Sequence, residues 1–217
     1  YLMYRRPPRS TLFPYTPIFR SAGVVRGQRV ARLRPGQSVA VMGSGMSGLL
    51  HIALAKALGA GRILATDISR YRLDAAKRFG ADAVVDASEN VPARLIELNG
   101  GRPVDLAIVC AGALSVFEQA LASVDRGGTV LCFAPTEPGV TLSVPVNDFW
   151  RNGITLLPSY GGSPEDIMVA IDLIRARRVP VEDMITHRLP LEQAGQGFRL
   201  VAGASESIKV LLLPHGG

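Results

Sequence analysis

The sequence predicts an α/β fold in which helices cover both faces of one parallel sheet. From Ser38 onward, short apolar runs of β-type residues alternate with helix-type segments, with little chain between them. The runs are continuously apolar rather than alternating, as is typical of strands that are buried on both faces. A Gly-x-Gly-x-x-Gly turn joins the first run to the first helix. Together these features predict a doubly wound, six-stranded sheet of the Rossmann type.

The elements follow from the pattern in chain order. The predicted strands cover residues 38–42, 62–66, 83–85, 105–110, 129–133 and 154–157. Apolar residues three or four positions apart predict the helices, which cover residues 24–33, 49–53, 70–79, 114–124 and 164–174. Gly80 and the pair Gly127–Gly128 are expected to end the helices before them. After about Arg178 the alternation stops, and two apolar runs at 185–190 and 208–213 flank a helix over 191–201.

The glycine turn carries the main functional signal. Gly43 would make the tight turn, Gly45 would let a pyrophosphate approach the backbone, and Gly48 would let helix and strand pack closely. Asp67 ends the next strand, 19 residues after Gly48, where a dinucleotide-binding fold places the carboxylate that holds the adenosine ribose. The alternative is a glycine turn in some other α/β protein. The combined pattern favours a dinucleotide site.

Composition excludes several other classes of function. The chain has 217 residues and a formal charge of +6, but residues 1–21 hold four arginines and no acid, so the remainder is only +2. This distribution argues against a nucleic-acid partner. No apolar run approaches the length of a membrane span. Cys110 and Cys132 lie on apolar runs without metal-like neighbours, and we expect a reduced, soluble, cytoplasmic protein.

Residues 1–21 are expected to be a non-native leader. They resemble the translation of a sequencing-library adapter joined to a truncated gene. The segment is expected not to form a helix, because it contains four prolines: Pro7, Pro8, Pro14 and Pro17. It also lacks the apolar core of a signal peptide. The alternative is a natural basic, proline-rich arm.

Several motifs, taken in their order and spacing, resemble the medium-chain alcohol dehydrogenases over nearly all of residues 22–217. They lie at residues 30–36, 43–48, 55–60, 67, 72–77, 80–82, 127–128 and 185–191. The last is most similar to the zinc-dependent polyol and threonine dehydrogenases. The resemblance implies a nucleotide-binding domain over 22–178. It also implies a short C-terminal return segment, residues 179–217, of a catalytic domain whose large N-terminal piece is missing.

The resemblance implies that this chain holds neither catalytic residues nor a metal site. In the family, the catalytic zinc ligands and the four-cysteine structural zinc loop belong to the missing piece, so zinc is expected only in the full-length parent. The chain has three histidines, and no Cys or His pair has zinc-site spacing. His51 is expected to be a packed side chain, His187 to have a structural role in the return segment, and His215 to lie in the tail.

The resemblance also implies the cofactor contacts, residue by residue. Gly43, Gly45, Met46, Ser47 and Gly48 would form the turn that cradles the pyrophosphate. Asp67 would bind both ribose hydroxyls with Arg72 nearby, and Cys110 and Ala111 would flank the adenosine half; Ala134 and Tyr160 would lie near the nicotinamide. Lys209 would reach the phosphates, with a solvated strand-edge lysine as the alternative. NAD is expected over NADP, because Asp67 would repel a 2′-phosphate.

The resemblance implies the cofactor-binding portion of a dehydrogenase that passes hydride from a secondary alcohol, such as a polyol, cyclitol or amino alcohol, to NAD. This portion alone is expected to be inactive. The alternatives are a fragment of a zinc-free quinone reductase-type oxidoreductase, a non-catalytic nucleotide-binding module, or a methyltransferase with a similar glycine loop. The expected partners are a small-molecule alcohol and further copies of the chain. Pairing through the edge strand 154–157 would give a homodimer or homotetramer.

Overall fold

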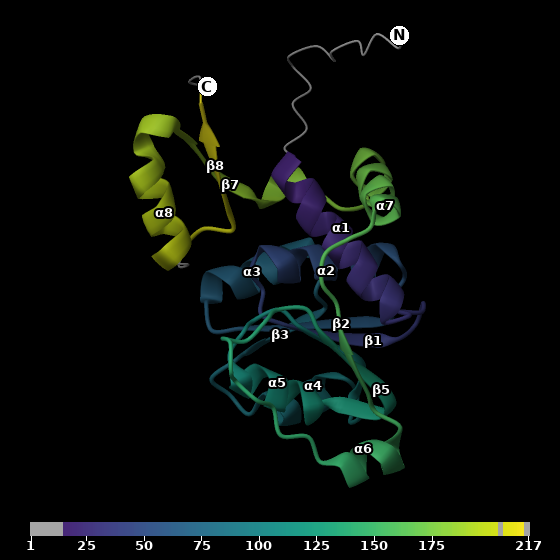
Figure 1. The fold of residues 1–217 in the computed structure, drawn as a ribbon. Coiled ribbons are helices and arrows are strands. Elements are labelled where there is room, and N and C mark those ends of the chain that lie inside the picture. Colours follow the sequence, from purple (N-terminus) through teal and green to yellow (C-terminus); the bar gives the residue numbers. More distant parts are fainter. Residues whose placement is uncertain (1–14, 204–205, 215–217) are drawn as a thin grey trace.

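The computed structural model describes residues 15–203 and 206–214, and its centre is a six-stranded parallel sheet (Figure 1). The strand order is β3-β2-β1-β4-β5-β6. The strands are β1 (Ser38–Met42), β2 (Arg62–Asp67), β3 (Ala83–Asp86), β4 (Val104–Val109), β5 (Val124–Cys132) and β6 (Thr155–Pro158). The order reverses between β1 and β4, and at such a switch point an open α/β sheet leaves a crevice for a ligand. The predicted doubly wound fold is confirmed.

Helices cover both faces of the sheet (Figure 1). One face carries α1 (Tyr15–Val30), α2 (Met46–Ala57), α3 (Arg70–Phe79) and α7 (Pro164–Arg175). The other face carries α4 (Val91–Leu98) and α5 (Leu114–Leu121), and α6 (Val146–Asn152) precedes the edge strand β6. None of the helices in residues 15–203 and 206–214 is long and apolar enough to cross a membrane.

The continuous apolar runs of the sequence are explained by two separate cores. Along β1, Val39 and Val41 point into the core beneath α2, while Ala40 and Met42 point into the core beneath α4 and α5. All five residues of β1 are buried. Because side chains alternate between two covered faces, most positions of a central strand are apolar.

The expectation of no helix before residue 22 is wrong for residues 15–21, because α1 runs from Tyr15 to Val30. Pro17 falls in its first turn, where backbone N–H groups have no helical partner to lose. Ala22 and Val24 anchor the helix because both are buried, with 1% of each exposed. Pro7, Pro8 and Pro14 lie outside the described residues, as does His215.

The segment after Leu114 also differs from the prediction, because α5 ends at Leu121 and Val124 already belongs to β5. Gly127 and Gly128 do not end a helix. They lie within β5, whose pairing with β4 shifts register between Val104 and Leu106. Gly127 has a φ of +70°, and a Cβ on Gly128 would lie 2.7 Å from the Asp125 carbonyl oxygen. The glycine pair is therefore required by an irregular strand.

Two further helices were not predicted, and both are short. In α4, Asn90 accepts a hydrogen bond from the Ala93 N–H, and a proline occupies the first turn. Both features are ordinary signals for the start of a helix. The helix was not predicted because its eight residues are too few to show a clear apolar periodicity. The other helix, α6, buries none of its residues and so lacks the apolar stripe by which a helix is recognised.

The last part of the chain forms a small unit outside the six-stranded sheet, on the side of α1, α2 and α3 (Figure 1). A short turn, η1 (Val181–Met184), leads from α7 into β7 (Ile185–Pro190), and η2 (Leu191–Gln193) leads into α8 (Ala194–Gly203). The final strand, β8 (Lys209–Leu213), pairs in parallel with β7. The predicted succession of strand, helix and strand is present. It brings the start of β8 close to the glycine turn, as described below.

Candidate functional site

The glycine turn lies between β1 and α2, at the switch point of the sheet. Gly43 has a φ of +101°, which favours glycine. A Cβ on Gly48 would lie 1.9 Å from the Gly43 carbonyl oxygen, so only glycine allows this close packing of turn and helix. At Gly45 the situation is opposite, because a Cβ there would meet only Arg72 Nη1, at 4.0 Å. The turn therefore has no room for a side chain at Gly48 but leaves open space at Gly45.

The open space at Gly45 lies at the N-terminus of α2. Gly45 is the N-cap residue and offers no side chain to the first N–H groups of the helix. Those N–H groups and the positive end of the helix dipole attract anions. Half-buried Met46 and Ser47 begin the helix beside this space. The arrangement fits a pyrophosphate, which would take the position that a side chain would otherwise fill.

Asp67 braces this turn from the end of β2. Its side chain is buried, and Oδ2 accepts a hydrogen bond of 2.8 Å from the Ser44 N–H, while Oδ1 accepts one of 2.9 Å from the Ser69 N–H. Each carboxylate oxygen can accept a second bond. Ser44 in turn donates from its hydroxyl to the Thr66 carbonyl oxygen at 3.1 Å. Ser44 was not predicted as a site residue, because it occupies a variable position of the glycine motif and carries no signal of its own.

Arg72, on α3, lies above the same turn. Its guanidinium reaches to 4.0 Å from the Cβ position of Gly45. Its Nε is buried and has no hydrogen-bond partner in the described part of the chain. A buried guanidinium N–H without an acceptor is energetically unfavourable, and a ligand oxygen at this place would satisfy it.

A second hollow, of about 280 Å³, lies between the glycine turn and the return segment. Gly45, Met46, Ser47, Cys110 and Lys209 all line it, so the structure brings these five predicted residues together. Burial, and to a smaller extent the charge of Arg20, lowers the pKa of Lys209. The ammonium of Lys209 therefore lies in a partly desolvated place where an anion would be held firmly.

Ala111 and Cys110 lie directly under the turn. A Cβ on Gly43 would come within 3.0 Å of the Ala111 Cβ, so these residues form a packed floor. Burial raises the pKa of the Cys110 thiol, which keeps it uncharged. Arg20 donates to Ser47 Oγ at 3.3 Å. It was not predicted as a site residue, because residues 1–21 were expected to be a non-native leader.

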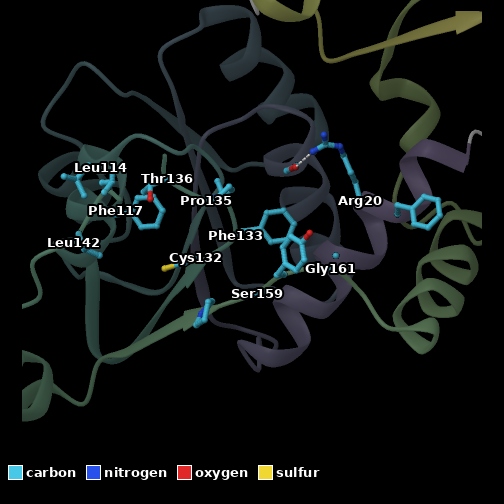
Figure 2. A pocket seen from close by; sticks show the side chains of 17 residues that line it. Arg20, Leu114, Phe117, Cys132, Phe133, Pro135, Thr136, Leu142, Ser159 and Gly161 are labelled. Carbon is cyan, nitrogen blue, oxygen red and sulfur yellow. Dashed lines mark hydrogen bonds between the residues drawn. The ribbon is translucent and has the colours of Figure 1, made fainter. Parts of the chain in front are cut away.

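A larger hollow, of about 640 Å³, opens beyond the carboxyl ends of β5 and β6 (Figure 2). Its apolar wall includes Leu114, Phe117, Cys132 and Leu142 (Figure 2). Ala134 and Tyr160, predicted at the nicotinamide end, both line it, and Tyr160 is almost fully exposed. Ser47 lines both this hollow and the smaller one, so the two adjoin at the start of α2.

His51 is a packed side chain, as predicted. It is fully buried, its ring lies edge-on to Phe133 at 4.5 Å between centroids, and Gln28 Nε2 donates to its carbonyl oxygen at 2.8 Å. Burial lowers the pKa of His51 to about 3. His187 is half-buried, and its Nδ1 lies 3.0 Å from Thr186 Oγ1. Among residues 15–203 and 206–214, no group of three or more His, Cys, Asp or Glu could hold a metal ion.

Comparisons with known proteins agree with this geometry. The sequence family described as zinc-binding dehydrogenase matches residues 48–176. The L-threonine 3-dehydrogenase of Bacillus velezensis is 34% identical over 181 residues, which are 82% of this chain and 52% of that protein. The sorbitol dehydrogenase of Bacillus subtilis is 31% identical over 198 residues, which are 90% of this chain and 55% of that protein.

Solved structures show the same likeness. An alcohol dehydrogenase from Thermus sp. ATN1 superposes with a TM-score of 0.83 at 30% identity, covering 89% of this chain and 56% of that one. A zinc-binding dehydrogenase from Sinorhizobium meliloti, solved bound to NADP, gives 0.82 at 25% identity, covering 91% of this chain and 58% of that one. The chain thus spans about half the length of the relatives it matches. These matches establish that the chain belongs to the zinc-binding dehydrogenase family.

Proposed function

We propose that this chain is the cofactor-binding portion of an NAD-dependent alcohol dehydrogenase. The observation that carries the proposal is the open space at Gly45, bounded by the uncapped start of α2 and by Arg72. A diphosphate in this space would accept hydrogen bonds from the first N–H groups of the helix. It would also satisfy the buried Nε of Arg72, which otherwise has no partner in the described part of the chain.

The chain would hold the rest of the dinucleotide at neighbouring places. The free acceptor positions of Asp67 would bind the hydroxyls of the adenosine ribose, and Lys209 would approach the phosphates from β8. Ala134 and Tyr160 would flank the nicotinamide in the apolar hollow. When bound, the nicotinamide would supply the hydride acceptor. The residues of this chain would position it and keep water from one of its faces.

The choice of NAD over NADP rests on the charge of Asp67. A buried carboxylate that already accepts two backbone hydrogen bonds cannot turn away from a 2′-phosphate, so the two anions would repel. Arg70 and Arg72 lie on the same helix and would weaken this preference. Arg70 is engaged by Asp74, at 3.3 Å from Nε to Oδ1, whereas Arg72 has no ion pair within the described residues.

The substrate of the longer protein would be a secondary alcohol, such as a polyol or an amino alcohol. The described residues do not fit a zinc site: His51 is buried against Phe133, and no three-ligand group is present among them. We therefore place zinc, and the alcohol oxidation it would assist, in the full-length parent, and we expect this chain to be inactive alone. That absence of a metal-ligand group favours a second candidate, a nucleotide-binding module without catalysis.

Self-association through β6 is part of the proposal. This strand is one edge of the sheet, and its Leu156 is 37% exposed. Trp150 and Val146 on the neighbouring helix are 80% and 74% exposed. An apolar edge with unpaired backbone groups favours pairing with another copy of the chain. Sedimentation would detect the dimer or tetramer, and a clean monomer at micromolar concentration, unchanged by Leu156→Lys, would rule the pairing out.

One preparation of the full chain tests the function. Its thermal unfolding would be followed with NAD and with S-adenosylmethionine, together with zinc analysis and oxidation assays on sorbitol and threonine. Stabilisation by NAD alone, without stoichiometric zinc or turnover, is the expected result. Stabilisation by S-adenosylmethionine alone would contradict a nicotinamide site. Tightly held zinc with measurable alcohol oxidation would contradict the placement of catalysis outside this chain.

A further inference from the structure

A basic hollow lies at the far end of α2 from the glycine turn. It has a volume of about 420 Å³, and four cations line it: Lys56, Arg78, Arg177 and Arg178. Ala53, Ala57, Phe79 and Pro180 complete its lining, so no acidic residue is among the lining residues. Since α2 has 12 residues, this hollow is about 17 Å along the helix from the start of α2.

Among residues 15–203 and 206–214, which hold all 18 acidic side chains, none of the four cations forms an ion pair. Arginines elsewhere do pair, as Arg29 does with Asp166 at 2.9 Å and Arg102 with Asp105 at 2.8 Å. Glu182 and Asp183 line an adjacent hollow, which shares only Arg177 and Pro180 with the basic one. The positive charge of the basic hollow is therefore not neutralised within it.

The helix dipole explains part of this cluster but not all of it. Three helices end at the hollow: α2 near Lys56, α3 near Arg78, and α7 just before Arg177. Cations at helix C-termini offset a negative end of about half an elementary charge each. Three such ends total about −1.5, against four positive side chains. By this estimate a positive excess of about 2.5 charges remains, and it favours binding of an anion.

The backbone holds one of these cations, Arg177, in an unfavourable conformation. Arg177 has a φ of +54°, in the left-handed region that favours glycine. Its N–H donates to Ile174 and that of Arg178 donates to Leu173, closing the end of α7. Glycine would serve this turn better, yet the chain has a large cation there. The geometry of the turn alone therefore does not explain an arginine at this position.

We propose that this hollow binds a small molecule carrying a phosphate or diphosphate group. Guanidinium groups form paired, charge-assisted hydrogen bonds with phosphate oxygens, and lysine adds a compact charge. The volume suits a small ligand rather than an extended strand. The site does not depend on the dinucleotide site, because it shares no lining residue with either hollow at the glycine turn.

Calorimetric titration of the full chain with pyrophosphate tests this proposal. Arg177→Gly is the sharpest variant, because glycine relieves the positive φ and should raise the unfolding temperature while removing one cation. We expect it to weaken pyrophosphate binding about fivefold or more. Arg78→Gln should do the same without changing the backbone. Arg126→Gln removes an exposed charge elsewhere and should leave the affinity within about twofold.

Because pyrophosphate can also occupy the glycine turn, Lys209→Gln is the second control. Binding that is lost in Lys209→Gln but kept in Arg177→Gly would overturn the proposal and assign the anion to the turn. An equal loss in Arg126→Gln would overturn it in favour of unspecific charge. A single-stranded oligonucleotide that binds far more tightly than pyrophosphate and depends on Arg78 and Arg177 would also overturn it, because the occupant would then be a nucleic acid.

Discussion

The backbone N–H of Ser44 donates a hydrogen bond of 2.8 Å to Oδ2 of Asp67. This bond joins the glycine turn at the end of β1 to the carboxyl end of β2, 23 residues further along the chain. The predicted ribose-binding carboxylate therefore also fixes the shape of the predicted pyrophosphate-binding turn. A change at Asp67 should consequently affect both parts of the cofactor site.

Replacing Asp67 by serine should weaken NAD binding. A hydrogen bond to a charged group contributes about 1.5–3 kcal/mol, so we expect a loss of roughly 10- to 100-fold in affinity. Binding of NADP should change less, because the repulsion of its 2′-phosphate is removed as well. Calorimetric titration with both cofactors measures the two effects. Equal affinities for NAD and NADP in the unmodified chain would show that the preference is absent.

Asp67→Asn is the matched control. It keeps one oxygen that can accept from Ser44 but removes the charge. It should retain the stability of the fold better than Asp67→Ser while losing the preference for NAD. If both variants keep that preference, the charge of Asp67 does not set cofactor choice.

Two glycines of the same motif should respond in opposite ways to alanine. A Cβ on Gly48 would lie 1.9 Å from a backbone oxygen, so Gly48→Ala should destabilise the fold by about 3 kcal/mol or more. This loss of stability is opposite in sign to the usual stabilisation when alanine replaces glycine inside a helix.

A Cβ on Gly45 meets open space, so Gly45→Ala should fold normally and bind NAD at least about tenfold more weakly. Urea unfolding and calorimetry separate the two outcomes. Loss of folding in Gly45→Ala would refute the open-space argument.

The ion pair between Arg29 and Asp166 should contribute to stability. It joins α1 to α7, with Nη2 2.9 Å from Oδ1, and Asp166 also accepts from the N–H and the hydroxyl of Ser163. Because Arg29 is half-exposed, we expect Asp166→Asn to cost only about 2–3 kcal/mol, mostly from the buried hydrogen bonds. The control Asp172→Asn, at an exposed position, should cost less than about 0.5 kcal/mol in urea unfolding.

This contribution should also depend on pH. Burial raises the pKa of Asp166, but hydrogen bonds from Ser163 and Arg29 outweigh it and hold the pKa below its usual value. The stabilisation is therefore fully present above about pH 4 and is lost as the pH falls through the lower folded-state pKa. If Asp166→Asn and the unmodified chain lose stability in parallel on acidification below that pH, the ion pair is not responsible.

The sequence predicted the sheet well because each central strand is buried on both faces, as β1 is. The prediction was wrong or incomplete where the local structure depends on the geometry of a strand or on contacts with residues distant in the sequence. Gly127 and Gly128 look like a helix end, but Gly127 is favoured by its positive φ within β5 and Gly128 by its close approach to the Asp125 carbonyl oxygen. Likewise, the brace between Ser44 and Asp67 and the unpaired Nε of Arg72 depend on contacts across the fold. Spacing along the chain cannot reveal such contacts.

His51 should make the fold less stable in mild acid. Its pKa falls from 6.5 to about 3 on folding, so between these values the unfolded chain binds a proton that the folded chain does not. Stability should drop by about 2 kcal/mol between pH 7.5 and pH 5. His51→Gln, which cannot take up this proton, should lose that part of the pH dependence. Urea unfolding at the two pH values checks this, and an unchanged pH dependence in the variant would mean that His51 titrates in the folded chain.

The central claim is that the glycine turn of this chain binds a nicotinamide dinucleotide. Calorimetric titration of the unmodified full chain with NAD tests it most directly. The account predicts one NAD per chain, a dissociation constant below about 1 mM, and at least about tenfold weaker binding in Gly45→Ala, whose fold is retained. No detectable binding of either NAD or NADP to the folded chain, or binding that Gly45→Ala leaves unchanged, would contradict it.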